Sequence, residues 1–68
     1  MIPIGKKGKI TNGPLKDWMI TVQEDKDNTG GFLILLTKNE EQYDEWANDL
    51  KDLEKLFAKR AWEVAWEK

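Results

Sequence analysis

This chain cannot form disulfide bonds or the usual zinc sites, because it contains neither cysteine nor histidine. A domain of 68 residues buries only about 60 % of the surface of its unfolded chain, and small domains often gain stability from disulfides or zinc. This chain must instead be held by apolar packing or by association with another chain. Its four tryptophans suit the first route, since each can bury on the order of 200 Å². We expect no cofactor and no metal site.

The same absences limit the chemistry that the chain could perform. Serine is also missing, so the common nucleophiles and the usual proton carrier near neutral pH are unavailable. Carboxylate pairs such as Glu40 with Glu41 and Asp44 with Glu45 remain. General acid–base catalysis needs a carboxylate in an apolar cleft, and one small core leaves little with which to build such a cleft. We therefore expect a protein that is not an enzyme.

Charge divides the chain into two parts. Residues 1–16 carry four lysines and no acid, whereas residues 17–68 carry all 13 acids against seven bases. Glycine and proline are frequent at the start, which predicts a basic, turn-rich arm over residues 1–14 and a single α+β domain over residues 15–68. The lysines that could contact nucleic-acid phosphates are Lys6, Lys7, Lys9 and Lys16.

Alternating apolar residues predict a β-hairpin over residues 17–37. Residues 18–22 alternate with a period of two, and residues 24–31 form a polar stretch that ends in two glycines. Residues 32–36 are apolar on both faces, which is typical of a central strand. A short edge strand could also begin at Ile10, within the arm.

The loop of this hairpin begins like a calcium-binding loop, with Asp25, Asp27 and Gly30 at suitable spacing. Position twelve of such a loop requires a bidentate glutamate, and this chain has Leu36 there. We therefore expect a solvated turn and no metal ion.

Spacings of three and four residues predict a long amphipathic helix from about residue 40 to residue 60. Asn39 with Gln42 offers a capping box, and Thr37 with Glu40 offers a competing frame. Acids in the first half and bases in the second half suit the helix dipole. The apolar stripe consists of Tyr43, Trp46, Leu50, Leu53 and Phe57.

Residues 61–67 are expected to form a strand instead of extending the helix, because a strand places Trp62, Val64 and Trp66 on one face. The predicted order is β-β-α-β, with one helix packed across a sheet of about three strands. A helical crossover favours a parallel, right-handed connection. The sheet order 1-2-3 is preferred to one in which the third strand lies beside the first.

Several strings of this sequence resemble small bacterial immunity-type proteins, which neutralise a companion toxin. They are Trp18-x-Ile20-x-Val22, Asn28-Thr29-Gly30-Gly31-Phe32-Leu33-Ile34-Leu35, Asp44-x-Trp46 and Trp62-x-Val64-x-Trp66. The resemblance covers residues 15–67 and leaves the basic arm unexplained. It implies an acidic binder whose partner is a basic protein, often a nuclease.

One helix can cover only one face of the predicted sheet. Met19, Leu33 and Leu35, together with Ala61 and Ala65, are expected on the other face. Such a face, or an exposed edge strand, is a place for a partner or for a second copy of the chain. Alternatively, the N-terminal segment folds back over it through Ile2, Ile4 and Ile10.

Acidic residues in the first half of the predicted helix form the second candidate surface, which would steer a basic partner. They are Glu40, Glu41, Asp44, Glu45 and Asp49. We therefore predict a small cytoplasmic protein-binding module of the acidic inhibitor or immunity type, which does not associate with membranes. The alternatives are a nucleic-acid-associated regulator that uses the basic arm and a structural homodimer.

Overall fold

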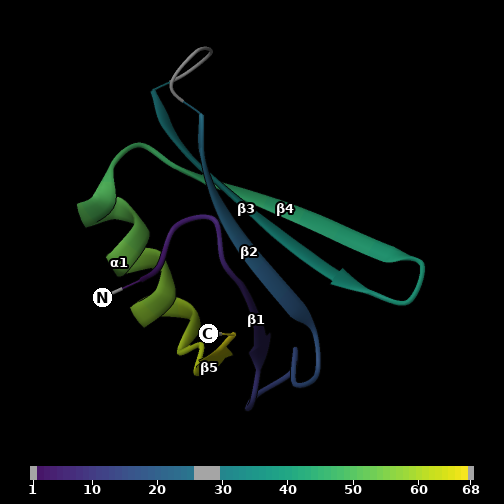
Figure 1. The fold of residues 1–68 in the computed structure, drawn as a ribbon. Coiled ribbons are helices and arrows are strands. Elements are labelled where there is room, and N and C mark those ends of the chain that lie inside the picture. The colour runs from purple at the N-terminus through teal and green to yellow at the C-terminus, as the bar shows by residue number, and fades with distance from the viewer. Residues whose placement is uncertain (1, 26–29, 68) are drawn as a thin grey trace.

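The computed structural model describes residues 2–25 and 30–67, and it places five strands and one helix within them (Figure 1). The elements are β1 (Lys7–Ile10), β2 (Met19–Asp25), β3 (Gly31–Lys38), β4 (Glu41–Ala47), α1 (Leu50–Arg60) and β5 (Val64–Trp66). The strands form one antiparallel sheet in the order β4-β3-β2-β1-β5. The α+β class with one helix is as predicted, but the described sheet has five strands where about three were expected.

The helix predicted from residue 40 begins only at Leu50. Asp49 is its N-cap, and the Asp49 carboxylate accepts a hydrogen bond of 2.8 Å from the backbone N–H of Asp52. Glu41–Ala47 forms β4, which pairs with β3 over seven residue pairs. Tyrosine and tryptophan favour strands, so pairing with β3 overrides the helical spacing of Tyr43 and Trp46. Neither predicted capping frame starts the helix.

The segment predicted as an arm contributes an internal strand. β1 lies between β2 and β5, with Lys7 opposite Thr21 and Lys9 opposite Ala65. Gly8 makes this position possible, because a Cβ there would collide with Val64 Cγ1 and lie 2.7 Å from Trp66 Cε3. The bare backbone at Gly8 lets the side chains of β5 cover the strand.

β5 forms where the sequence predicts a strand, but its neighbour differs from the prediction. It pairs antiparallel with β1 and lies at the opposite edge of the sheet from β4. Since every neighbouring pair in the sheet is antiparallel, β4 and β5 run in the same direction. α1 therefore connects two strands that run in the same direction but lie at opposite edges of the sheet. The predicted parallel pairing of the last strand is wrong, because β5 pairs antiparallel with β1. The predicted order 1-2-3 is also wrong, because β5 lies on the β2 side of the hairpin and not beside β3.

The core lies between α1 and one face of the sheet. Phe57 of α1 stacks on Trp66 and meets Trp62 edge-on, with ring centroids 6.3 and 5.1 Å apart, respectively. Trp18 stacks on Tyr43 at 5.3 Å. The buried side chains are Ile10, Trp18, Ile20, Val22, Ile34, Leu36, Ala47 and Leu53. Three of the four tryptophans thus pack in or against the core, as the absence of cross-links requires.

Candidate protein-binding surface

The two faces of the sheet differ because successive side chains of a strand point to opposite sides. On β3, Ile34 and Leu36 point toward α1 and are buried, whereas Leu33 and Leu35 point away and are half-buried. We call the side that points away from α1 the outer face. The strand register sets which residues share it.

Three rows of cross-strand partners cover the outer face. The central row is Lys7, Thr21, Leu35 and Asp44, on β1, β2, β3 and β4 in turn. One neighbouring row is Lys9, Met19, Thr37 and Gln42. The other is Gln23, Leu33 and Trp46. Most of the apolar side chains lie toward the middle of the sheet, and the charged ones lie at its flanks.

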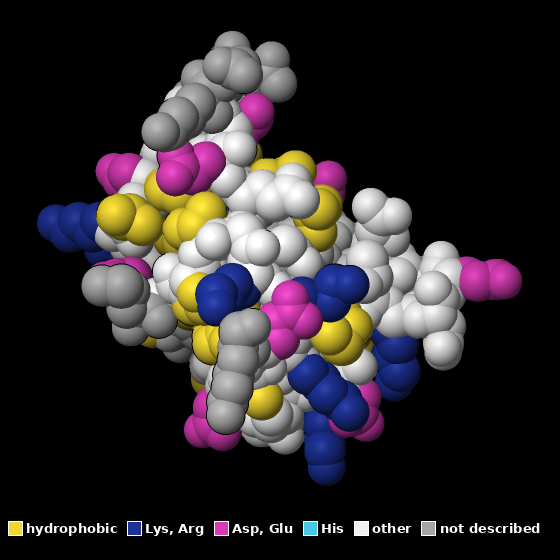
Figure 2. Space-filling view, in the orientation of Figure 1, with side chains coloured by type: hydrophobic (Ala, Val, Ile, Leu, Met, Phe, Trp, Pro, Cys, Tyr) yellow, Lys and Arg dark blue, Asp and Glu magenta, His cyan; other side chains and the backbone are white. Residues whose placement is uncertain are grey.

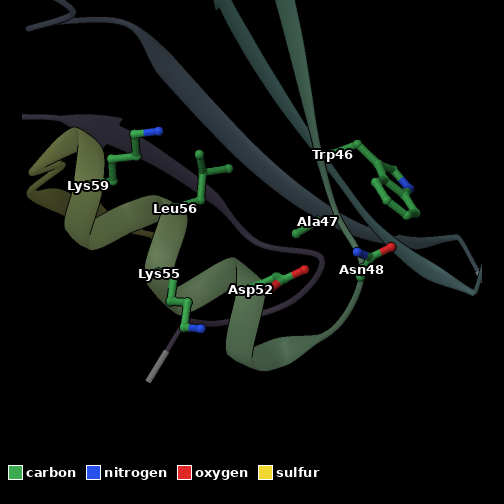
Figure 3. A pocket seen from close by; sticks show the side chains of 7 residues that line it. All are labelled: Trp46, Ala47, Asn48, Asp52, Lys55, Leu56 and Lys59. Carbon is green, nitrogen blue, oxygen red and sulfur yellow. The ribbon is translucent and has the colours of Figure 1, made fainter.

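Trp46 is the large apolar side chain that the outer face exposes most, with 45 % of its surface accessible. Its indole lies against the backbone of Gly31 on β3, where an added Cβ would lie 2.8 Å from the ring. Figure 3 shows Ala47 directed toward α1 and the Trp46 side chain directed away from the helix. Tryptophans in such positions are frequent anchors of protein interfaces.

Charges of opposite sign lie on the two flanks of the outer face. Lys7 and Lys9 are exposed on β1, and Asp44 is exposed on β4. Residues 6–17 carry four lysines against one aspartate, and residues 38–47 carry four acids against one lysine. Figure 2 shows Lys and Arg side chains at the left, in the centre and at the lower right of the view, with Asp and Glu side chains among them, and an acidic side chain at the far end of the β3–β4 hairpin. The charge division along the sequence thus becomes a division across the sheet.

The structure spreads the five predicted acids over several elements. Glu40 lies in the turn before β4, and Glu41 begins that strand. Glu45 points to the inner side and accepts a hydrogen bond from the Arg60 guanidinium of α1. Asp49 caps α1, and Glu41 lies on the same side of β4 as Glu45. Asp44 is therefore the one acid of the five on the outer face of β4, with Glu40 in the turn that precedes the strand. The prediction of one acidic helix surface is wrong because this segment forms a strand.

The three apolar candidates are on the outer face, as the alternation predicted. Met19, Leu33 and Leu35 are half-buried there, and Ala65 of β5 shares the same side. Ala61 does not, because it ends α1 in a left-handed conformation, with φ of 56°.

The N-terminal segment does not supply the predicted cover for these residues. Ile10 is fully buried in the core, and Ile2 and Ile4 pack against that same core on the side of α1. Within residues 2–25 and 30–67, the sheet order leaves the outer face without a second layer.

The four candidate lysines are not equivalent in the fold. Lys7 and Lys9 share the outer side of β1, whereas Lys6 precedes the strand and Lys16 lies in the loop before β2. The Lys9 ammonium lies 3.7 Å from the Asp17 carboxylate, and each side chain is 56 % exposed. Such an exposed pair holds loosely and leaves Lys9 able to contact a partner.

Sequence reasoning missed Trp46, because the spacing placed it in the buried stripe of the helix. Residues 41–47 show no alternation of polar and apolar side chains, so no local signal for a strand was present here. A strand assignment for β4 would have placed Trp46 on the same side as Leu33.

A groove between α1 and the end of β4 offers little for catalysis (Figure 3). It holds about 490 Å³ of empty space, part of it open to solvent. Its lining residues are Trp46, Ala47, Asn48, Asp52, Lys55, Leu56 and Lys59. A single carboxylate among them does not form an acid–base pair.

The described part of the chain has neither a metal-binding cluster nor a membrane-spanning helix. Residues 2–25 and 30–67 contain no group of three metal-ligating side chains. Residues 26–29, which hold part of the motif resembling a calcium loop, lie outside the described residues. The helix of the described chain has 11 residues, and no helix there is long and apolar enough to span a bilayer.

No protein-family model, no curated protein and no solved structure matches this chain. The function therefore has to be argued from the geometry of the outer face.

Proposed function

We propose that this protein acts by binding another protein through the outer face of its sheet, and that it catalyses no reaction. The observation that carries the proposal is the group of apolar side chains on this face, Met19, Leu33, Leu35 and Trp46, over which residues 2–25 and 30–67 place no second layer. Apolar surface of this kind with a polar and charged rim is typical of protein interaction sites.

The face also specifies the chemistry of the partner. Side chains of the partner would exclude water from Leu33 and Leu35, and a basic group would meet Asp44. Asp44, and Glu40 in the turn before β4, would speed association with a basic partner more than they add to its affinity. An acidic inhibitor of the immunity type, acting in the cytoplasm on a basic protein, fits this description and is the narrower form of the proposal.

Nucleic acid is the second candidate, because Lys7 and Lys9 stand on one side of β1. Their neighbours on β2 are Thr21 and Met19, where a binder of single strands would place aromatic rings for stacking. Asp44 lies at the end of the Lys7 row and would repel a phosphate backbone. The outer face therefore favours a protein partner over nucleic acid.

The test compares Leu35→Glu with the matched variant Leu50→Glu, which changes an equally apolar side chain on α1 that is 57 % exposed. Proteins retained from an extract of the source cells by the immobilised wild type are purified, and their affinity for each variant is measured by biolayer interferometry. We expect Leu35→Glu to raise the dissociation constant at least about tenfold, because it places a charge in an apolar contact. Leu50→Glu should leave it unchanged.

A partner that binds Leu35→Glu as tightly as the wild type would refute the outer face as the binding surface, provided that circular dichroism shows the variant folded. If it does not fold, Asp44→Lys replaces it, because this exposed residue can be reversed without loss of packing. Salt-dependent quenching of tryptophan fluorescence by DNA or RNA at about 50 mM salt would instead support the second candidate.

A further inference from the structure

We propose further that the outer face binds a second copy of this chain, packed face to face about a twofold axis parallel to the strands between β2 and β3. This proposal rests on the proposed function, because it names the partner of the same surface. It is argued from the order of side chains across the sheet and from the opposite charges of its two flanks.

A twofold axis in this position exchanges the two flanks of the sheet. β1 of one copy then lies over β4 of the other, and β2 lies over β3, as in an isologous dimer of two aligned sheets about 10 Å apart. The central row of the outer face runs Lys7, Thr21, Leu35, Asp44. The rotation places Lys7 over Asp44 of the second copy and Thr21 over Leu35. The charges of this row are therefore complementary to those of the same row in the second copy.

The neighbouring rows meet without a clash of charge. Met19 comes over Thr37, Lys9 comes over the neutral Gln42, and Gln23 comes over Leu33. The chain continues beside β2 beyond β1, where Gly5 donates a backbone hydrogen bond of 2.7 Å to the Val22 carbonyl. Gly5 lies on the flank opposite Trp46, so the rotation brings the exposed indole toward a residue without a side chain.

The loops at the end of the sheet add to the same complementarity. The β1–β2 loop, which contains Lys16, and the β3–β4 turn, which contains Glu40, lie at the same end of their strands. Exchange of the flanks brings the basic loop of one copy toward the acidic turn of the other. The excess of lysines in residues 6–17 thus faces the excess of acids in residues 38–47.

Two other ways of pairing the sheets bring like charges together. A twofold axis perpendicular to the strands would place β1 over β1, so that Lys7 and Lys9 of one copy would face those of the other. Edge-to-edge antiparallel pairing of β4 about its middle residue would set Asp44 directly against Asp44, which is destabilising across strands. The face-to-face arrangement along the strands avoids both repulsions.

The size of the face sets the strength of the expected dimer. Four strands spaced by about 4.8 Å give a contact roughly 15 to 20 Å wide, with an area of a few hundred Å² per copy. This is below the roughly 1,200 Å² in total that standard specific interfaces bury, so we expect a weak dimer that forms at high protein concentration.

The test is a charge exchange between two variants, followed by sedimentation velocity over a range of concentrations in low salt, where surface charges are least screened. The wild type should shift from 8.0 kDa toward twice that mass as the concentration rises. Lys7→Glu alone and Asp44→Lys alone should each raise the dissociation constant roughly tenfold, since each turns two attractive contacts into repulsive ones. An equimolar mixture of the two variants should recover wild-type association, because both cross-pairs are then of opposite sign.

Lys51→Glu and Glu54→Lys are the matched controls, since both side chains are exposed on α1, away from the outer face. Neither should weaken the dimer, and their mixture should behave as each does alone. A wild type that stays at 8.0 kDa at all concentrations would overturn the dimer. A dimer that ignores Lys7→Glu, or a mixture that fails to recover, would overturn this geometry.

The outcomes also separate this proposal from the proposed function. If the wild type stays monomeric while Leu35→Glu abolishes binding of a foreign protein, the face binds protein but not a second copy. If the chain dimerises and Leu35→Glu, in a folded form, leaves both the dimer and any foreign binding intact, both proposals fail.

Discussion

β3 takes part in two surfaces of different kinds. Its inward leucine and isoleucine, Leu36 and Ile34, are 2 % and 0 % exposed, while Leu33 and Leu35 on the other side are only half-buried. The four side chains are nearly equivalent in chemistry, so the difference comes from what lies over them. α1 covers one side, and the described chain has no second layer for the other. Within the described residues, a strand that is apolar on both faces is therefore covered on one face only.

The largest expected effect is a difference in the free energy of unfolding between alanine variants of two adjacent residues, one on each face of β3. Ile34→Ala should lower the free energy of unfolding by about 3 kcal/mol, because it opens a cavity beneath α1. Leu35→Ala should cost less than half as much in the monomer, since its side chain is already partly in water. Urea unfolding followed by tryptophan fluorescence, at low protein concentration, measures both.

Equal losses for Ile34→Ala and Leu35→Ala in the monomer would show that the outer face is packed as tightly as the inner one. The outer face would then have a cover within the chain, and both binding proposals would lose their basis. Thr21→Ala, half-buried on the outer side of β2, serves as a polar control and should have a small effect.

A smaller loss of stability is expected on the inner side of β1, where the side chains of Val64 and Trp66 on the neighbouring β5 lie over Gly8. Gly8→Ala should cost about 2 kcal/mol, because the new methyl group meets Trp66 Cε3 at 2.7 Å and also collides with Val64. Lys7→Ala is the control, since Lys7 is adjacent in sequence but exposed on the outer face. Near-ultraviolet circular dichroism should report displacement of the Trp66 ring only in Gly8→Ala. An unchanged spectrum and stability would mean that β5 does not pack on β1 as described.

Local pattern was enough to predict the elements whose own residues alternate clearly. β2 and β5 follow from their periods of two, and β3 follows from its continuous apolar run. The second half of the predicted helix follows from Leu53 and Phe57. Met19, Leu33 and Leu35 reached the outer face by the same reasoning.

The elements that failed depend on distant partners. Glu41–Ala47 contains glutamates that favour helix and a three-residue spacing that suits either structure, so only its pairing with β3 decides in favour of a strand. β1 has one large apolar residue, Ile10, and becomes a strand because Gly8 fits beneath Trp66, more than fifty residues away in sequence. Trp46 was not predicted on the outer face, because the segment that forms β4 was predicted to be helical.

The smallest expected effect is on the free energy of unfolding, and it distinguishes two aspartates that were predicted to share one acidic surface. Asp49→Ala should cost about 1 kcal/mol at every protein concentration, because it removes the side-chain acceptor at the start of α1. Asp44→Ala should leave the monomer within about 0.5 kcal/mol of the wild type, since its side chain is exposed on the outer face.

At high protein concentration, Asp44→Ala should lose the part of the wild type's thermal stability that comes from association, because a dimer stabilises the folded chain by mass action. Melting curves at low and high concentration therefore give different signatures for the two residues. A concentration-independent loss in Asp44→Ala would place that carboxylate in the monomer's own structure, and the charge flank of β4 would then have no part in binding. A concentration-dependent loss would separate the two aspartates by role: one carboxylate holds the helix over the inner face, and the other lies where the second sheet is expected to pack.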